Sequence, residues 1–463
     1  MSDTTGDPDE TAAMLEAAIQ LHREGNLSVA SGLYTQVIQR QPRNHDALHN
    51  LGRLALEVQR PDQAVRLLAQ AIALRPELVE SHLALGNAQN ALSDYEAALE
   101  SFTAAARLNP ASATAHFNRG NVLRLFKQVD AAIESYDTAI ALQPDFAIAH
   151  HNRAFCLLQT GDLVAGFRAY EWRRKCPTFD DPRYRLDRAW TGEADIAGKT
   201  LFIFPELFQG DLIQVCRYAL AAERRGARVL LAAPQAMHRL LRSMSPALEL
   251  LAEDAMPRDF DLQAPLMSLP LAFGTTLASL PQESGYLRAE PERVAHWRER
   301  IGAEGLRIGV VWQGSTLPYA LPLQRSFPLA ALDRISRLPG VRLISLQKHN
   351  GLDQLAKLPA GMAVETLGEA FDLGPDAFID TAAAMACCDL VVTMDTSVAH
   401  LAGALGLRTW VALPYISDWR WLIDRTDSPW YPSARLFRQP SRGDWPGVFA
   451  DMEAALRAEW PAG

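Results

Sequence analysis

The segment best suited to hold an anion runs from Met394 to Ala404. An apolar, strand-like run ends at Asp395, and a helix is predicted to begin directly after it, with Thr396 and Ser397 in its first turn. The first turn of a helix has free backbone N–H groups and the positive end of the helix dipole, which suits a phosphate. His400 lies on the same helix face as the two hydroxyls. The alternative is a structural role, in which Asp395 or Thr396 caps the helix and His400 is a core histidine.

A second polar segment follows a predicted buried strand over residues 200–204 and leads into a predicted helix that starts at Asp211. The segment reads Phe204-Pro205-Glu206-Leu207-Phe208-Gln209-Gly210-Asp211. A carboxylate at this place either caps the helix or acts as a general base that faces a cleft. Both possibilities stay open for Asp211, and we place Glu206, Phe208, Gln209 and Gly210 in the loop near the site.

Two more predicted strands end in polar residues. The first ends in Val310-Val311-Trp312-Gln313-Gly314-Ser315 and is followed by Arg325 and Ser326. Gly314 permits close backbone approach and Arg325 can clamp a diphosphate, although this segment taken alone slightly favours an ordinary turn and a surface arginine. The second ends in Ser345-Leu346-Gln347-Lys348, where Gln347 either reads a nucleobase or ribose or faces solvent.

Two other clusters are assigned no chemistry. Asp259-Phe260-Asp261 has the spacing of a divalent-metal site, but alternating aspartates are common in loops, so we expect no metal. The aromatic residues in 418–421 and 430–432 are predicted to pack between lobes. Walker, Gly-x-Gly-x-x-Gly and zinc motifs do not occur in the sequence.

The polar strand ends belong to two blocks of alternating strands and helices, the pattern of a parallel sheet. We predict two doubly wound lobes, over residues 199–300 and 301–463. In such sheets ligands bind at the carboxyl ends of the strands. A cleft between the lobes is therefore expected to hold the site.

The first third of the chain is predicted to be a tetratricopeptide-repeat α-solenoid, because a proline recurs every 34 residues. Small residues at other repeating positions, such as Gly52, Gly86 and Gly120, would let paired helices cross closely. The predicted boundaries are a disordered terminus (1–10), full repeats (11–44, 45–78, 79–112 and 113–146), a degraded fifth repeat (to 175) and a linker (176–198).

Composition narrows the possible partners. The 463 residues are 48% hydrophobic and 21% charged, with a formal net charge of −9, so nucleic acid is not expected as a partner. The polar N-terminus lacks the features of a secretory signal, and the longest uncharged run, 262–282, contains three prolines, so no membrane span is expected. The five cysteines lack metal or redox spacing, which favours reduced thiols and a cytoplasmic protein.

From about Thr11 to Glu459, the chain resembles bacterial proteins that fuse tetratricopeptide repeats to a domain of the heptosyltransferase family (family-nine glycosyltransferases). The motifs that carry the resemblance are Gly210-Asp211, Val311-Trp312-Gln313-Gly314, Arg325-Ser326, Ser345-Leu346-Gln347 and Asp395-Thr396-Ser397-Val398-Ala399-His400.

This resemblance implies a GT-B fold of two Rossmann-like lobes and an inverting, metal-independent transfer of sugar from a nucleotide-sugar, with no further cofactor. Asp211 matches the family's proposed base. Asp395, Thr396, Ser397 and His400 match the segment that meets the donor phosphates, and Trp312, Gly314 and Arg325 match donor-side loops. We also place Ser315 and Gln347 on the donor side, and a protein or peptide partner on the concave face of the repeats.

One position departs from the family pattern. The family usually has a glycine where this chain has Phe208, so a bulky side chain replaces a residue that can adopt a positive φ. Two functions therefore remain: a glycosyltransferase, or a non-catalytic repeat scaffold with a degenerate sugar-nucleotide-binding domain.

Overall fold

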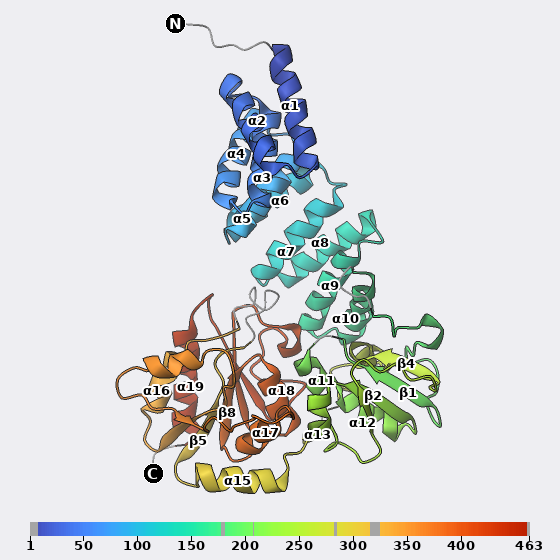
Figure 1. Cartoon of the computed structure of the whole chain (residues 1–463), viewed down its shortest axis with the longest axis vertical. Coiled ribbons are helices and arrows are strands. Elements are labelled where there is room, and N and C mark those ends of the chain that lie inside the picture. Colours follow the sequence, from blue (N-terminus) through green and yellow to red (C-terminus); the bar gives the residue numbers. More distant parts are fainter. Residues whose placement is uncertain (1–7, 177–180, 207, 282–284, 315–324, 461–463) are drawn as a thin grey trace. The chain divides into compact units, whose positions relative to one another are not determined.

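The computed structural model describes residues 8–176, 181–206, 208–281, 285–314 and 325–460 (Figure 1). The chain divides into two compact units, Met1–Cys156 and Leu157–Gly463. Among the described helices, none has both the length and the apolar character needed to cross a bilayer.

The first unit is a series of helix pairs in which, from the first helix to the eighth, each helix packs against the next along the chain. Its helices are α1 (Pro8–Arg23), α2 (Leu27–Arg40), α3 (His45–Glu57), α4 (Pro61–Leu74), α5 (Val79–Ala91), α6 (Tyr95–Leu108), α7 (Ala113–Leu125), α8 (Val129–Leu142) and α9 (Ala147–Thr160), the last of which continues into the second unit. Helix α1 thus begins at Pro8, inside the terminus that the sequence analysis expected to be disordered.

The repeating prolines end the second helix of each pair. The residue before each proline is the C-cap and has an extended backbone, with φ between −131° and −139°. Proline disfavours the helical conformation in the preceding residue, which explains why α2, α4, α6 and α8 all stop at the same register.

The repeating glycines allow the paired helices to approach closely. A Cβ atom at these glycines would lie 2.7 Å from Leu68 (at Gly52), 2.6 Å from Phe102 (at Gly86) and 2.8 Å from Tyr136 (at Gly120). Real Cβ atoms do not come this close to a carbon atom, so the helix crossing requires glycine.

The turn inside each helix pair has a residue in the left-handed conformation, again every 34 residues. These residues are Gly25, Gln59, Ser93, Lys127 and Gly161, with φ between 56° and 92°. Only the first and last are glycine, so the sequence analysis did not detect this feature.

In the part of the second unit that the structure describes, the strands form two parallel sheets. The first sheet has the order β3-β2-β1-β4 and the second β10-β9-β8-β5-β6-β7. The strands are β1 (Thr200–Phe204), β2 (Arg228–Ala233), β3 (Glu249–Ala252), β4 (Leu262–Pro265), β5 (Leu306–Val310), β6 (Val341–Ser345), β7 (Glu365–Thr366), β8 (Leu390–Met394), β9 (Thr409–Leu413) and β10 (Ala434–Arg438).

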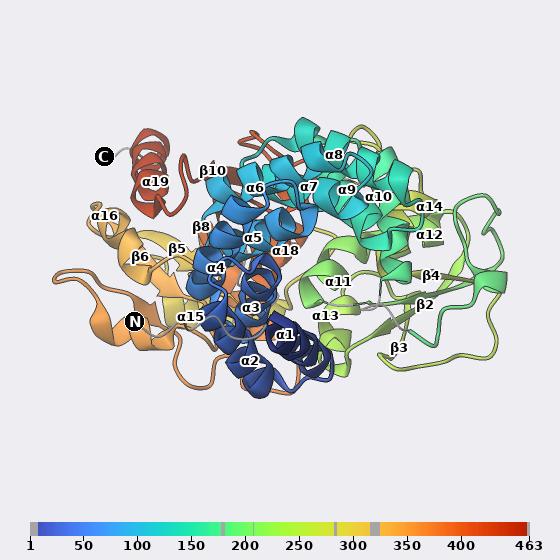
Figure 2. The same cartoon turned by 90° about the horizontal axis from the view of Figure 1, so that it is seen from above.

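Helices cover the second sheet on both faces, with α16 and α19 on one side and α17 and α18 on the other (Figures 1 and 2). The helices of this unit after α9 are α10 (Leu163–Tyr170), α11 (Gln209–Val215), α12 (Arg217–Arg224), α13 (His238–Leu241), α14 (Leu269–Ala272), α15 (Pro291–Ile301), α16 (Asp333–Ser336), α17 (Ile379–Met385), α18 (Ser397–Ala404) and α19 (Trp445–Glu459). The second unit is therefore an α/β unit, and its sheet order in the second lobe matches that of a dinucleotide-binding sheet.

The strand orders reverse at β1 in the first sheet and between β5 and β8 in the second. Such switch points are where open α/β sheets bind ligands. The segments that follow these strands contain Asp211, Gly314 and Asp395, so the topology places these candidate residues at both switch points.

Some predicted elements differ from the structure. Two connections that follow strands in the alternating pattern are only short helical turns: η6 (Leu329–Leu332) leads into α16, and η3 (Gln235–Met237) leads into α13. Residues 181–198, expected as a linker, pack on the first sheet, where Trp190 is buried and its N–H donates to the carbonyl of Gln263 at 2.8 Å.

Candidate functional site

The loop before Asp211 brings this carboxylate to the switch point of the first sheet. Helix α11 begins at Gln209, so Asp211 lies in its first turn. Phe208 precedes the helix with φ −124°, an extended conformation that any residue adopts, and its side chain is 43% exposed. A bulky side chain at position 208 therefore causes no backbone strain.

Gly210 places this turn directly against the start of α18. A Cβ atom at Gly210 would lie 3.2 Å from Cδ2 of His400 and 3.7 Å from Cα of Ser397. A side chain would crowd this contact, so glycine permits the approach. The two segments that carry the clearest chemical signals in the sequence thus lie together.

Thr396 is the N-cap of α18, since its side-chain oxygen accepts a hydrogen bond from the N–H of Val398 at 3.2 Å. Asp395 consequently has no capping role. It is buried, 3% exposed, and its Oδ2 lacks a hydrogen-bond partner among the described residues. Ser397 is half-buried at the first helical position.

His400 is a buried and neutral imidazole. Its Nδ1 lies 3.0 Å from the hydroxyl of Tyr431, and its ring stacks on Trp421 with centroids 5.5 Å apart. Burial lowers the pKa of His400 to about 3, and the nearby Arg420 acts in the same direction. His400 therefore has the packing of a core histidine, and it does not carry a positive charge to a ligand near neutral pH.

A chain of alternating charges connects the two lobes at this place. Arg420 contacts Oδ1 of Asp211 at 2.5 Å and Oδ1 of Asp418 at 2.8 Å. Arg325 lies 3.5 Å from Oδ2 of Asp418 and 3.3 Å from Oδ2 of Asp395. We call these five side chains the charge chain; it joins the carboxylate of the first lobe to the start of α18.

Burial and the neighbouring guanidinium groups shift the pKa values of the three carboxyl groups in the charge chain. Burial raises the pKa of Asp211 and of Asp395, although Arg420 and Arg325, respectively, oppose this shift. Burial also disfavours the charged form of Asp418, but Arg420 and Arg325 outweigh it and lower the pKa of that carboxyl. Asp418 is thus the anion that holds both guanidinium groups.

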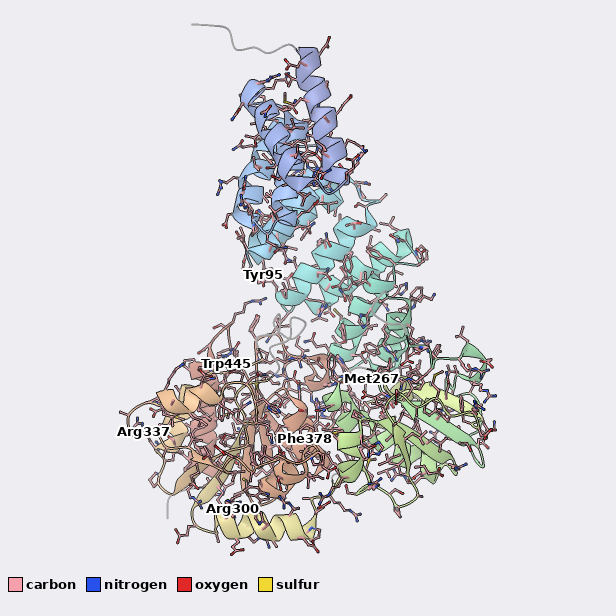
Figure 3. The ribbon with its side chains drawn as sticks, viewed as in Figure 1. Tyr95, Met267, Arg300, Arg337, Phe378 and Trp445 are labelled. Carbon is pink, nitrogen blue, oxygen red and sulfur yellow. The ribbon has the colours of Figure 1, made fainter. Side chains whose placement is uncertain are left out.

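Glu206 is occupied by structural contacts. Both of its oxygens accept from Arg173, at 2.7 and 2.9 Å, and one also accepts from the backbone N–H of Met267, which is labelled in Figure 3. The Glu206 side chain is 3% exposed. The sequence analysis placed Glu206 near the site, and the structure makes it an anchor of the loop rather than a group that meets a ligand.

The predicted donor-side loops divide into residues that reach the site and residues that do not. Gly314 reaches it, because a Cβ there would lie 3.3 Å from Cγ2 of Thr396. Trp312 is fully buried, and its ring N–H donates to the carbonyl of Gly351 at 3.1 Å. Its role is packing in the core of the second lobe.

Gln347 also has an internal role. Its Oε1 accepts from the backbone N–H groups of Trp312 and Gln313, at 3.0 and 3.1 Å, and its Nε2 donates to the carbonyl of Gln313 at 2.7 Å. The side chain therefore holds the loop after β5, which corrects the expectation that it reads a nucleobase or faces solvent. Ser315 lies outside the described residues.

Asp261, one of the two alternating aspartates, has a structural partner. Its Oδ2 accepts from the N–H of Thr200 at the start of β1, at 2.7 Å. Among the described residues, His, Cys, Asp and Glu side chains form no group that could hold a metal ion.

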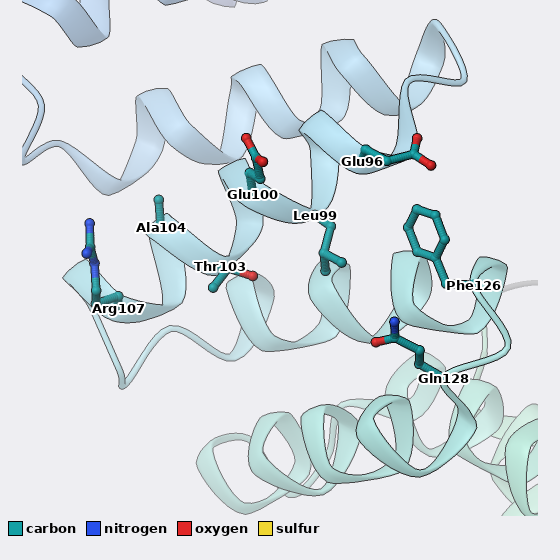
Figure 4. A pocket seen from close by; sticks show the side chains of 8 residues that line it. All are labelled: Glu96, Leu99, Glu100, Thr103, Ala104, Arg107, Phe126 and Gln128. Carbon is teal, nitrogen blue, oxygen red and sulfur yellow. The ribbon is translucent and has the colours of Figure 1, made fainter.

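The repeats have a hollow of about 600 Å³ on α6 and the turn between α7 and α8 (Figure 4). Leu99, Ala104 and Phe126 give it an apolar lining, with Glu96 at one end, Glu100 near the middle and Arg107 at the other end.

Asparagine side chains connect successive repeats. Asn118 donates to Asn87 at 3.5 Å, and 34 positions later Asn152 donates to Asn121 at 2.8 Å. These amides form an inter-repeat ladder that the sequence analysis did not detect, although their spacing of 34 is visible in the sequence.

The site residues that sequence reasoning missed are Asp418 and Arg420. Arg420 lies within η8 (Trp419–Trp421) and Asp418 is its N-cap, so both belong to the aromatic cluster that was assigned to packing. Trp419 and Trp421 are indeed buried. A signal was nevertheless present, because an Asp-x-Arg pair among tryptophans requires partners for its charges when it is buried.

Comparison with known proteins identifies the repeats. Family models described as tetratricopeptide repeat match residues 21–86, 83–145 and 128–177. Protein FlbA of Caulobacter vibrioides (strain ATCC 19089 / CIP 103742 / CB 15) is 27% identical over 327 residues, which cover 66% of this chain and 54% of FlbA. The chain thus spans about half the length of this curated relative.

Solved structures with a likeness to the chain include MamA and YrrB. A crystal structure of MamA is 22% identical, covers 36% of this chain and 90% of its own, and has a TM-score of 0.34. MamA from Desulfovibrio magneticus RS-1 is 20% identical, covers 37% of this chain and 94% of its own, and has a TM-score of 0.34. YrrB, a TPR protein with an unusual peptide-binding site, is 17% identical, covers 35% of this chain and 84% of its own, and has a TM-score of 0.33.

The family models confirm the prediction that was made from the spacing of the prolines. Residues 21–177 of this chain are tetratricopeptide repeats.

Proposed function

We propose that the chain is an inverting, metal-independent glycosyltransferase with a GT-B arrangement of its two lobes. It would move a sugar from a nucleotide-sugar to a hydroxyl of a protein or peptide held by the repeats. The observation that carries the proposal is the contact of the Gly210–Asp211 turn with the first turn of α18, which places a carboxylate from one lobe beside a helix N-terminus from the other.

Asp211 is proposed as the general base. Its Oδ1 pairs with Arg420, and we assign to Oδ2 the role of accepting the proton of the acceptor hydroxyl. Burial raises the pKa of Asp211, which makes the ionised carboxylate a better proton acceptor than an exposed aspartate. The acceptor oxygen would bond to the anomeric carbon while its proton passes to Asp211.

The start of α18 is proposed to stabilise the leaving group. As the bond between the anomeric carbon and the diphosphate oxygen breaks, the electron pair stays on the diphosphate. The backbone N–H of Ser397 and the guanidinium of Arg325 would face this developing charge. The Arg325 side chain is 29% exposed. Fixed positive groups of this kind can replace a divalent metal.

The repeats are proposed to bind the acceptor. Tetratricopeptide arrays offer extended surfaces for other chains. The amide pairs Asn87–Asn118 and Asn121–Asn152 repeat with the period of the array and present groups that can bond to a peptide backbone in any sequence.

Isothermal titration calorimetry of the full chain with UDP, ADP and their sugar conjugates tests donor binding, followed by an assay for sugar release or transfer. Asp211→Asn should lower turnover by about 10²–10⁴-fold and leave the Kd of the donor nearly unchanged. Asp259→Asn removes an exposed carboxylate from the same unit and serves as the matched control. Equal turnover by Asp211→Asn and the wild type would remove Asp211 as the base.

A non-catalytic scaffold is the second candidate, and the ion pair between Asp211 and Arg420 favours it. A carboxylate that stays paired with a buried guanidinium is a structural group and not a base. Binding of nucleotide-sugars without any turnover, in the presence of candidate acceptor peptides, would support the scaffold.

A further inference from the structure

The end of the repeat array is built into the α/β unit. The second unit begins at Leu157, and the repeat models extend to residue 177, so residues 157–175 belong to the repeat pattern in sequence and to the α/β unit in structure. We call these residues the capping segment. It includes the end of α9, α10 and the 3-10 helix η1 (Glu171–Lys175).

Arg173 fixes the capping segment to the loop that leads to Asp211. The residue is 6% exposed, and its guanidinium bonds both oxygens of Glu206, with Glu171 at 2.7 Å and Ser268 at 2.9 Å as further partners. The neighbouring elements also touch, because α10 packs beside α14 (Figure 2). One buried cation thus anchors the loop five residues before Asp211.

The same segment contacts the part of the second lobe that carries Arg420. Gln159 donates from its side chain to the carbonyl of Ser417 at 3.2 Å, and its own carbonyl accepts from the N–H of Ile423 at 3.0 Å. Phe167 meets Trp419 edge to face, with ring centroids 5.5 Å apart. These contacts lie on both sides of Asp418 and Arg420 in the sequence.

We propose that the capping segment sets the distance between the two halves of the site, with Arg173 as a positioning residue for Asp211 and Gln159 as one for Arg420. This inference rests on the proposed function in one respect, because Asp211 and Arg420 are groups of the proposed sugar transfer. A single element that contacts both Glu206 and the 417–423 segment holds Asp211 in register with Arg420 and Asp418 of the charge chain. Arg420 adds two direct contacts of its own, to Oδ1 of Asp211 and to Oε1 of Gln214.

Hydrogen–deuterium exchange on the full chain tests the proposal without a ligand. Arg173→Gln leaves Glu206 as a buried, unpaired carboxylate, so exchange should rise about tenfold or more across 205–216 while β2 and β8 keep their protection. Gln159→Ala should raise exchange across 416–424 by a smaller factor. If Arg173→Gln does not fold, the double variant Arg173→Gln/Glu206→Gln removes both charges and is measured in its place.

Arg228→Gln is the matched control. Arg228 also bonds both oxygens of a glutamate in the first lobe, Glu249, but this pair is exposed. The control should leave exchange across 205–216 unchanged. The second readout is turnover of a nucleotide-sugar, which Arg173→Gln should lower about tenfold or more while the Kd for UDP or ADP changes less than about threefold.

Unchanged exchange across 205–216 in Arg173→Gln, relative to Arg228→Gln, would overturn the proposal even if the wild type transfers sugar. A wild type that binds no nucleotide would instead refute the proposed function, and the exchange data would still decide the role of the capping segment. Increased exchange spread evenly over the α/β unit would mean a general loss of stability and would also contradict positioning.

Discussion

The repeat unit and the α/β unit satisfy their polar side chains over very different distances along the chain. In the repeats the same local bond recurs, as His82, His116 and His150 each contact the carbonyl of the proline six residues earlier. In the α/β unit Arg420 contacts Asp211, which is 209 residues away. Local bonds that recur are visible as a period in the sequence, whereas a bond between distant segments leaves no such trace.

Removing one member of a buried ion pair should therefore lower the free energy of unfolding most in the α/β unit. Arg420→Gln leaves Asp211 and Asp418 without their shared cation, and we expect a loss of about 3–5 kcal/mol in the free energy of unfolding of this unit. Unfolding in denaturant, monitored by hydrogen–deuterium exchange in residues 157–463, measures this loss. Arg425→Gln, which breaks the more exposed pair with Asp427, should cost less than about 1 kcal/mol. Similar losses in both variants would contradict the importance of the charge chain.

His400 should make the stability of the α/β unit depend on pH. Burial lowers its pKa to about 3 in the folded state, while the unfolded chain takes up the proton near the ordinary value of about 6.5. Between these values the unfolded state binds more protons, so stability falls as the pH falls. From pH 6.5 to 4.5 the loss should be about 2–3 kcal/mol.

The difference between the wild type and His400→Gln isolates this contribution, because the carboxyl groups titrate in both proteins. The pH dependence of unfolding should be shallower in the variant. Parallel curves for the two proteins would show that His400 is not buried in its neutral form.

In the repeat unit, the glycine crossings should be the sensitive positions. Gly86→Ala places a Cβ atom 2.6 Å from Phe102, and overpacking of this kind should cost about 1–2 kcal/mol after the better helix propensity of alanine is included. Gly32→Ala is the matched control, since a Cβ atom there has no neighbour within 4 Å. Thermal unfolding should show a lower Tm for Gly86→Ala and a slightly higher Tm for Gly32→Ala. Equal shifts would mean that the crossing adapts.

The smallest effect is expected at the turns inside the helix pairs. Ser93 has φ 62°, where glycine is unstrained, so Ser93→Gly should stabilise the repeat unit by about 0.5–1 kcal/mol. Ser93→Ala keeps the Cβ atom and should give no gain. A gain of the same size in both variants would assign the effect to the lost hydroxyl and not to the backbone.

These differences between the units also explain what could be predicted from the sequence. The repeat register followed from Pro42 and its equivalents, and the parallel sheets of the second unit from the alternation of strands and helices. The left-handed turns were missed because Gln59, Ser93 and Lys127 are not the residue types that mark such turns.

In the candidate site, the sequence located strand ends but not the use of each side chain. Thr396 could be placed because it follows a buried strand almost directly, and Asp211 because it lies in the first turn of the helix after one. Trp312 and Gln347 also stand at strand ends, yet they are used for packing and for holding a loop. Arg420 could not be paired with Asp211, because only the folded chain brings the two lobes together there.

The position at which the α/β unit begins has a consequence for how such a protein can change length. The part of the repeat pattern that belongs to this unit begins at Leu157. Whole 34-residue modules upstream of Ala147 can therefore be gained or lost as cassettes, with the last one retained as a fixed adaptor. The number of repeats can then change while the fold of the second unit stays the same.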